Sequence, residues 1–105
     1  PAWIVAQANT LAQLHGWSSF VALQIEYSLA QRDSERDLIP MARAFDLGVT
    51  AWSPLAGGIL SGKYAKTAKS DTARYNGESN PPDERKLRIG ETVTKLADER
   101  GRPAS

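Results

Sequence analysis

A glycine-rich segment near the middle of the chain holds the residue types best suited to chemistry. It spans residues 51–64, with the sequence AWSPLAGGILSGKY, and follows a short apolar run typical of a β-strand. Pro54 would end the strand, and the three glycines would let a ligand come close to the backbone. Backbone N–H groups, the hydroxyls of Ser53 and Ser61 and the cation of Lys63 suit an anionic ligand such as a pyrophosphate.

Two further side chains lie at predicted strand ends, where βα proteins gather their ligands. Trp52 ends the strand before the glycine-rich segment and offers a flat indole for stacking on an aromatic ring. Gln24 lies near the end of an earlier strand, and its amide can donate and accept hydrogen bonds at once, which matches a carboxamide. The sequence therefore predicts a nucleotide cofactor, whereas no set of residues resembles a proton donor arranged for catalysis.

Simpler interpretations stand beside these. Trp52 could belong to the core, and Gln24 could be a polar residue satisfied at a strand end. Lys63 and Arg74 could be solvated surface cations, and the glycine-rich segment could be only a tight connection. His15, the single histidine, is interpreted as a residue of a helix C-terminus and not as a ligand.

The composition is that of an ordinary globular protein. The 105 residues are 41% hydrophobic with a net charge of +1, which gives no electrostatic case for binding nucleic acid or an anionic membrane. No apolar run approaches the roughly 20 residues of a membrane span. The absence of cysteine excludes disulfides and suits a reducing cytoplasm, and a single histidine argues against a protein-only zinc site. We therefore expect a cytoplasmic protein without a metal site.

Helices and strands alternate along the sequence, which favours an α/β fold of βα units around a parallel sheet. The periodicity of apolar residues distinguishes the two kinds of element. The expected order is a helix over 2–15 ending at Gly16, a strand over 20–25 buried on both faces, a helix from the N-cap Asp33 to Phe45, a strand over 49–52, a long polar loop over 65–82 and a helix over 83–100. Pro40 either kinks the second helix or marks its late start.

Both ends of the sequence look cut. No Met precedes Pro1, which already adjoins a helical pattern, and residues 101–105 resemble the opening of a helix. Two strands do not make a stable parallel sheet alone, and their edges would be unpaired. We therefore expect residues 1–105 to be a partial domain, truncated at both ends.

The stretches over residues 24–29 (QIEYSL) and 48–64 (GVTAWSPLAGGILSGKY) together resemble the aldo-keto reductase superfamily. The likeness is greater to its bacterial members and to the related potassium-channel β subunits, and it runs through the whole chain. It implies a segment of a (β/α)8 TIM barrel, about a third of the whole. On this resemblance, the chain holds about two βα units with barrel strands six and seven, and stops before strand eight.

The resemblance also implies a role for each candidate side chain at the strand ends. Gln24 would hydrogen-bond the nicotinamide carboxamide of NADP, and Trp52 would stack on the nicotinamide ring and leave one face open for hydride transfer. The implied reaction is the NADPH-dependent reduction of a small aldehyde or ketone to an alcohol.

The glycine-rich segment would hold the phosphates of the same cofactor. Ser53, Leu55 and Gly57 would bind the pyrophosphate, largely through backbone groups. Lys63 and Arg74 would reach phosphates or the adenosine end across the long loop.

The chain departs from the family in one large respect. The family's catalytic Asp, Tyr, Lys and His lie on earlier strands, upstream of Pro1, and neither Tyr27 nor His15 is one of them. The chain alone should therefore not reduce a carbonyl, and NADPH binding by this piece alone is doubtful. We expect its partners to be the remainder of the barrel or copies of itself. The alternatives are a non-catalytic nucleotide-binding module and a structural barrel fragment that self-associates.

Overall fold

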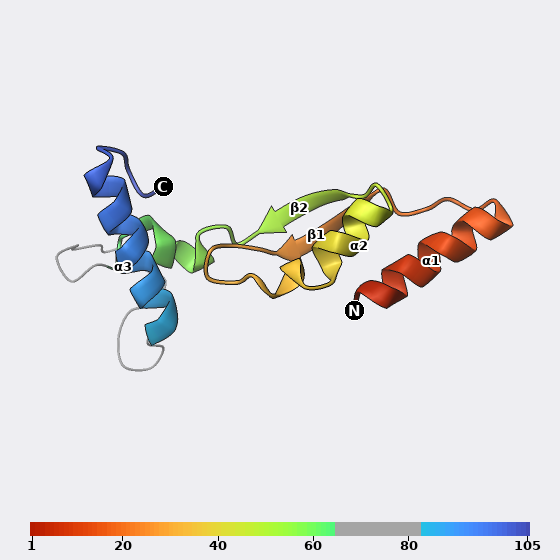
Figure 1. Cartoon of the computed structure of the whole chain (residues 1–105), viewed down its shortest axis with the longest axis horizontal. Coiled ribbons are helices and arrows are strands. Elements are labelled where there is room, and N and C mark those ends of the chain that lie inside the picture. Colours follow the sequence, from red (N-terminus) through yellow and green to blue (C-terminus); the bar gives the residue numbers. More distant parts are fainter. Residues whose placement is uncertain (65–82) are drawn as a thin grey trace. The chain divides into compact units, whose positions relative to one another are not determined.

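The computed structural model of the chain describes residues 1–64 and 83–105 (Figure 1). Residues 1–27 and 31–52 form one compact unit, and the described residues 28–30, 53–64 and 83–105 form a second. The polar stretch expected as a loop over 65–82, with Arg74 inside it, lies outside the described residues.

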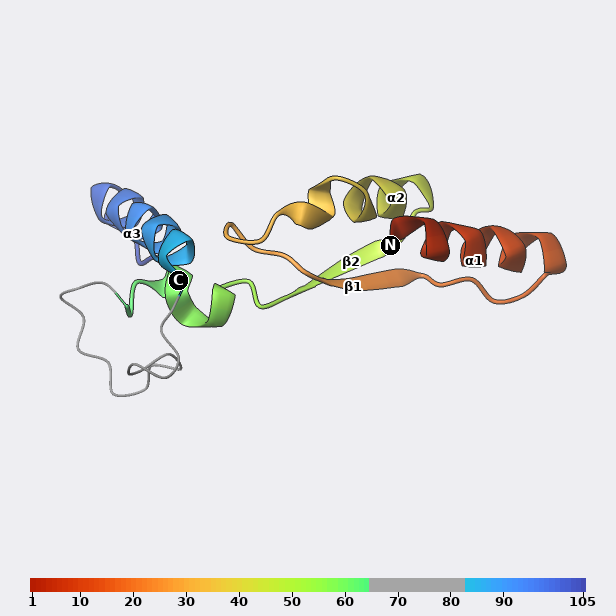
Figure 2. The ribbon, with the colours of Figure 1, turned by 90° about the horizontal axis from the view of Figure 1, so that it is seen from below.

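Two parallel strands form the centre of the first unit, as the alternation of helices and strands predicted. β1 (Ala22–Glu26) pairs with β2 (Gly48–Trp52), and the register places Gln24 opposite Thr50 and Glu26 opposite Trp52. The short helix α2 (Leu38–Ala44) connects them and lies along one side of the pair (Figure 2). The chain therefore contains the parallel βαβ arrangement of an α/β protein.

The predicted burial of the first strand on both faces is wrong for the described residues. Ile25 is the buried residue of β1, whereas Phe20 and Val21 precede the strand and are exposed, Val21 at 80%. Within the described chain each strand has a single neighbour, so one edge of each lacks a partner. The N–H and C=O groups along these edges are therefore not paired with another strand of the described chain.

The second predicted helix begins later than expected. Asp33 starts a single 3₁₀ turn, η1 (Asp33–Glu35), and the N-cap of α2 is Asp37, whose carboxylate accepts a hydrogen bond from the Leu38 amide at 2.6 Å. Pro40 is then the third residue of the helix. The first amides of an α-helix have no partner within it, so a proline in this turn removes no helical hydrogen bond. Of the two readings of Pro40, the late start is the right one.

The first helix and its end are confirmed. α1 (Ala2–His15) ends at Gly16, which adopts the left-handed conformation with φ 67°. Asn9 in its middle is 3% exposed and holds the chain ahead of β1. Its side-chain nitrogen donates to the Phe20 carbonyl at 3.1 Å, and its oxygen accepts from the Phe20 amide at 2.9 Å. One buried amide thus satisfies both backbone groups of Phe20.

Asn9→Ala is expected to lower the free energy of unfolding by roughly 1–3 kcal/mol, because it leaves the backbone groups of Phe20 without partners. Chemical denaturation measures the change. Thr10→Ala is the matched control, since the Thr10 hydroxyl is exposed and bonds only the Ala6 carbonyl of its own helix. Equal losses of unfolding free energy in the two variants would show that the hydrogen bonds between Asn9 and Phe20 do not stabilise the fold.

The second unit packs a 3₁₀ segment, η2 (Ala56–Ser61), against the helix α3 (Glu84–Glu99). Its core contains Ala30, Ala56 and Leu60, with Ile89 of α3 packed on them. Asp83 caps α3 by accepting from the amides of Arg85 and Lys86, which confirms the predicted helix. Residues 102–105 form no regular element, so the helix expected to open there is not seen.

Candidate cofactor site

Gln24 and Trp52 lie on one face of the parallel pair. Registered partners project to the same side of a sheet, and Gln24 and Glu26 are the partners of Thr50 and Trp52. Gln24 and Trp52 are therefore diagonal neighbours on the face opposite Ile25. Both are exposed, Trp52 at 49%, so the indole is not a core side chain in the described structure. An amide and a flat indole on one accessible surface are able to meet a planar ring that carries a carboxamide.

The chain beyond β1 is held by a hydrogen-bonded group that the sequence analysis did not identify. The Tyr27 amide donates to the Trp52 carbonyl at 3.3 Å, so the ladder extends one residue past the strand. The Tyr27 hydroxyl donates to Glu35 Oε1 at 2.6 Å. Arg32 donates from Nε and Nη2 to the two oxygens of Glu35, each at 2.8 Å, in the bidentate geometry typical of strong ion pairs. The only signal in the sequence was the close spacing of the three residues.

This group shifts the pKa values of its members. Hydrogen bonds from Arg32 and then from Tyr27 lower the pKa of the Glu35 carboxyl to about 2, because both donors favour the ionised form. The hydrogen bond to Glu35 raises the pKa of the Tyr27 hydroxyl. A hydroxyl whose proton is directed at Glu35, with a raised pKa, is poorly suited to give that proton to a substrate. That Tyr27 is not a catalytic acid stays a prediction.

The group should make stability depend on pH in acid. The folded pKa of Glu35 lies below its ordinary value of 4.5, so its contribution is complete above that value and is lost as the pH falls toward about 2. We expect urea titrations at several acid pH values to show the difference between the wild type and Glu35→Gln narrowing over this range. Tyr27→Phe removes one of the two donors to Glu35, so the loss of stability in acid should occur at a higher pH in this variant than in the wild type. A difference that does not change with pH would contradict the assignment.

Residues 53–64 of the glycine-rich segment, called the glycine-rich loop below, lie in the second unit and have a strained backbone. Ser53 and Ala56 have φ values of 56° and 49°, and Gly57 and Gly58 have φ values of 70° and 91°. Such left-handed values at non-glycine residues cost about 1 kcal/mol or more and collect at ligand sites. Leu55, with φ −100° and ψ 13°, immediately precedes the left-handed Ala56. A right-handed residue followed by a left-handed one turns successive amides toward one point, which is the geometry of an anion-binding nest.

The amides of this nest are partly free. The Ala56 amide donates to the Ser53 carbonyl at 2.9 Å, and the Gly58 amide donates to the Leu55 carbonyl at 2.9 Å. Among the described residues, the amides of Leu55 and Gly57 have no hydrogen-bond acceptor. Two backbone donors without an acceptor in the described part of the chain suit a group that brings its own acceptors, such as a phosphate.

Lys63 folds back over this loop. Its Nζ lies 2.6 Å from the position that a Cβ on Gly58 would occupy, and 5.5 Å from the centroid of the Tyr64 ring. It is the only charged side chain between Asp46 and Lys66 in the sequence, and within the described chain it forms no ion pair. Because Gly58 has no side chain, the Lys63 ammonium can lie against the loop, and no described acidic side chain neutralises it.

The structure therefore groups the predicted site residues in two sets. Gln24 and Trp52 share a surface of the first unit. The second unit contains the remaining described members, and these share the glycine-rich loop: Ser53, Leu55, Gly57 and Lys63. No group of three or more His, Cys, Asp or Glu side chains able to hold a metal ion occurs among the residues that the structure describes. No helix within the described ranges is long and apolar enough to cross a membrane.

Comparison with known proteins places these features in one family. The model of the Aldo/keto reductase family matches residues 1–105. A Saccharomyces cerevisiae protein whose name contains the words aryl-alcohol dehydrogenase is 36% identical over 108 residues, which cover 96% of this chain and 28% of that protein. Norsolorinic acid reductase of Aspergillus flavus is 31% identical over 105 residues, covering 100% of this chain and 26% of that protein.

A human relative, aflatoxin B1 aldehyde reductase member 4, is 40% identical over 79 residues, which cover 72% of this chain and 24% of that protein. The chain spans 24–28% of the length of these three curated relatives. Two parallel strands with their helices agree with part of such a protein. The match of the family model over all 105 residues decides the question, and the chain belongs to the aldo/keto reductase family.

Proposed function

We propose that the native polypeptide is an NADPH-dependent reductase of aldehydes or ketones, and that this chain supplies part of its cofactor site. The observation that supports the proposal most strongly is the glycine-rich loop. Its left-handed residues, the free amides of Leu55 and Gly57 and the ammonium of Lys63 together suit a pyrophosphate. Membership of the aldo/keto reductase family makes a nicotinamide dinucleotide the pyrophosphate-bearing ligand to expect.

In this proposal the chain binds and orients the cofactor and does not perform the proton transfer. Gln24 hydrogen-bonds the carboxamide, Trp52 supports one face of the nicotinamide ring, and the loop with Ser53, Leu55 and Gly57 holds the pyrophosphate. Lys63 supplies positive charge, and Arg74 of the stretch outside the described residues is proposed to do the same. When bound, NADPH supplies a hydride to the carbonyl carbon, and the proton for the oxygen comes from a part of the barrel that this chain does not contain.

We infer further that β1 and β2 are strands six and seven of a (β/α)8 barrel and that the rest of that barrel is the partner of this chain. Each strand has one edge without a partner among the described residues. Large apolar side chains are exposed on α1 and just before β1, including Trp3, Leu14 and Val21. Neighbouring strands and helices would cover these groups and remove their contact with water.

The same exposed groups support a second candidate. If the 105 residues stand alone, copies of the chain would associate through the open strand edges and the apolar surface, as a structural fragment without reductase activity. Intact mass of the native polypeptide under denaturing conditions separates the two. A mass well above the 11.4 kDa of this chain supports the barrel, and a mass equal to it supports the fragment.

An activity assay of the native polypeptide tests the reductase directly. The name of the yeast relative mentions an aryl alcohol and that of the human relative an aldehyde, so benzaldehyde is a suitable first probe. We expect consumption of NADPH that depends on the aldehyde. Tight NADPH binding without turnover of any aldehyde or ketone would instead support a nucleotide-binding protein that is not an enzyme.

A further inference from the structure

The helix α3 approaches the glycine-rich loop more closely than a side chain would allow. Gly90 is the buried residue of α3, and a Cβ built on it would lie 2.6 Å from the backbone oxygen of Ile59 in η2. The neighbour is backbone of a residue that is 2% exposed, so it has little room to move. Glycine costs a helix about 1 kcal/mol relative to alanine. Close approach of α3 to the loop explains why a glycine occurs here at that cost.

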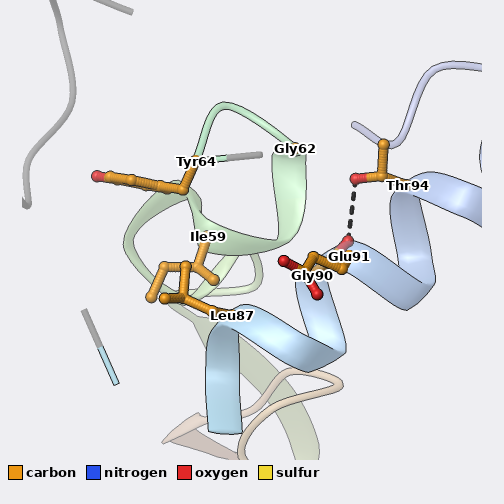
Figure 3. Close-up of a pocket in the computed structure, with 7 residues that line it drawn as sticks. All are labelled: Ile59, Gly62, Tyr64, Leu87, Gly90, Glu91 and Thr94. Atoms are coloured by element: carbon orange, nitrogen blue, oxygen red, sulfur yellow. Dashed lines mark hydrogen bonds between the residues drawn. The ribbon is translucent and has the colours of Figure 1, made fainter. Parts of the chain in front are cut away.

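A second contact lies one helical turn further along α3. A Cβ on Gly62 would lie 2.9 Å from Thr94 Oγ1, and Gly62 has the left-handed φ of 82° that ends η2. The Thr94 hydroxyl donates to the Gly90 carbonyl at 2.9 Å, which holds the threonine in this orientation (Figure 3). Ile59, Gly62, Gly90 and Thr94 together line a small pocket between the loop and the helix. The loop therefore rests on α3 at two points, Ile59 and Gly62.

These two points lie beside the groups that were assigned to the phosphates. Ile59 follows Gly57 and Gly58 directly, and Gly62 precedes Lys63, whose ammonium lies against Gly58. A shift of α3 would move both ends of this turn, and with it the free amide of Gly57 and the charge of Lys63. Displacements of about 1 Å in a positioned site can change binding or rate by up to a hundredfold.

We propose that Gly90 and Thr94 are positioning residues of the cofactor site: they fix the glycine-rich loop, through Ile59 and Gly62, in the conformation that binds the pyrophosphate. This rests on the proposed function, because it takes the ligand of the loop to be the pyrophosphate of NADPH. Gly90 and Thr94 lie on α3 and do not hold the ligand themselves. The proposal therefore predicts that substitutions on this helix change the affinity for the cofactor.

Thr94→Ala and Thr92→Ala form a matched pair for the test. Thr92 lies on the same helix and also donates to the carbonyl four residues earlier, that of Arg88 at 2.9 Å, but its side chain is exposed. Both substitutions remove the same kind of hydrogen bond, and only Thr94→Ala removes the contact with Gly62. The readout is the dissociation constant of NADPH and of adenosine 2′-monophosphate, which has neither phosphate of the pyrophosphate, for each variant of the native polypeptide.

We expect Thr94→Ala to weaken NADPH binding about threefold to tenfold, and Gly90→Ala to weaken it tenfold or more. Binding of adenosine 2′-monophosphate should change less than about twofold, and Thr92→Ala should alter neither constant. Equal affinities in Thr94→Ala and Thr92→Ala, or an equal loss for both ligands in Thr94→Ala, would overturn the positioning role. Absence of NADPH binding by the wild type would instead overturn the proposed function itself.

Discussion

Gly57→Val is expected to weaken NADPH binding by the native polypeptide tenfold to a hundredfold. Gly57 has a φ of 70°, in the left-handed region that a β-branched residue avoids. The valine would either strain the loop by roughly 1–3 kcal/mol or move it to another conformation, and either result disturbs the free amides of Leu55 and Gly57. A fluorescence titration of NADPH into each variant measures the loss.

Gly101→Val is the matched control for this substitution. Gly101 also has a left-handed φ, of 60°, and a Cβ there would meet nothing within 4 Å. The backbone strain is therefore similar, whereas the position lies after α3 and outside the proposed site. We expect Gly101→Val to lower stability and leave NADPH affinity unchanged. A loss of affinity shared by both variants would show that general destabilisation, and not the loop, is responsible.

Trp52→Ala is expected to weaken NADPH binding about tenfold. Stacking of an aromatic side chain on a base is worth about 1–3 kcal/mol, and the half-exposed indole of Trp52 is available for it. Trp52→Phe should recover part of the affinity, since a ring remains. The same titrations, with kcat measured at saturating NADPH, separate a loss of binding from a loss of orientation for hydride transfer.

Trp17→Ala serves as the control for Trp52→Ala. Trp17 is more exposed than Trp52 and stacks on His15 at the end of α1, with ring centroids 4.7 Å apart. Its removal changes an exposed tryptophan without touching the strand face that bears Gln24. Unchanged NADPH affinity in Trp52→Ala would contradict the stacking role, and an equal loss in Trp17→Ala would make the effect non-specific.

Elements with a local signal were predictable from the sequence. Gly16, which follows an apolar helical pattern, predicted the end of α1, and Asp83, which precedes such a pattern, predicted the start of α3. Both were predictable because helix caps depend on residues close in sequence. The second helix was misplaced because Asp33 and Asp37 are both acceptable N-caps. Pro40 is tolerated only near a helix start, and that argument favours Asp37.

Burial and long-range contacts were not predictable in the same way. The apolar run over 20–25 predicts a strand with two covered faces, but cover depends on neighbours that the described chain does not contain. No pattern in the sequence indicates that Asn9 bonds the backbone of Phe20. Nor does any pattern indicate that Gly90 lies against the Ile59 carbonyl. Such contacts join residues eleven or more positions apart, beyond the reach of periodicity and capping arguments.

The candidate site was predicted from residue types, and the structure brings some of the predicted residues together. Gln24 and Trp52 do share a face, and Lys63 does lie against the glycine-rich loop. Their roles toward a cofactor stay predictions, as does that of Arg74. The strained values at Ser53 and Ala56 had no signal in the sequence, because neither residue type favours a left-handed conformation.

Titration of the native polypeptide with NADPH, followed by tryptophan fluorescence in the wild type and in Trp52→Phe, tests the central claim most directly. We predict saturable quenching with one NADPH bound per polypeptide, and a quenching amplitude that falls sharply when Trp52 is replaced, because the nicotinamide ring stacks on that indole. Absence of saturable NADPH binding, or quenching of the same amplitude in Trp52→Phe, would contradict the claim that this chain forms the nicotinamide end of a reductase cofactor site.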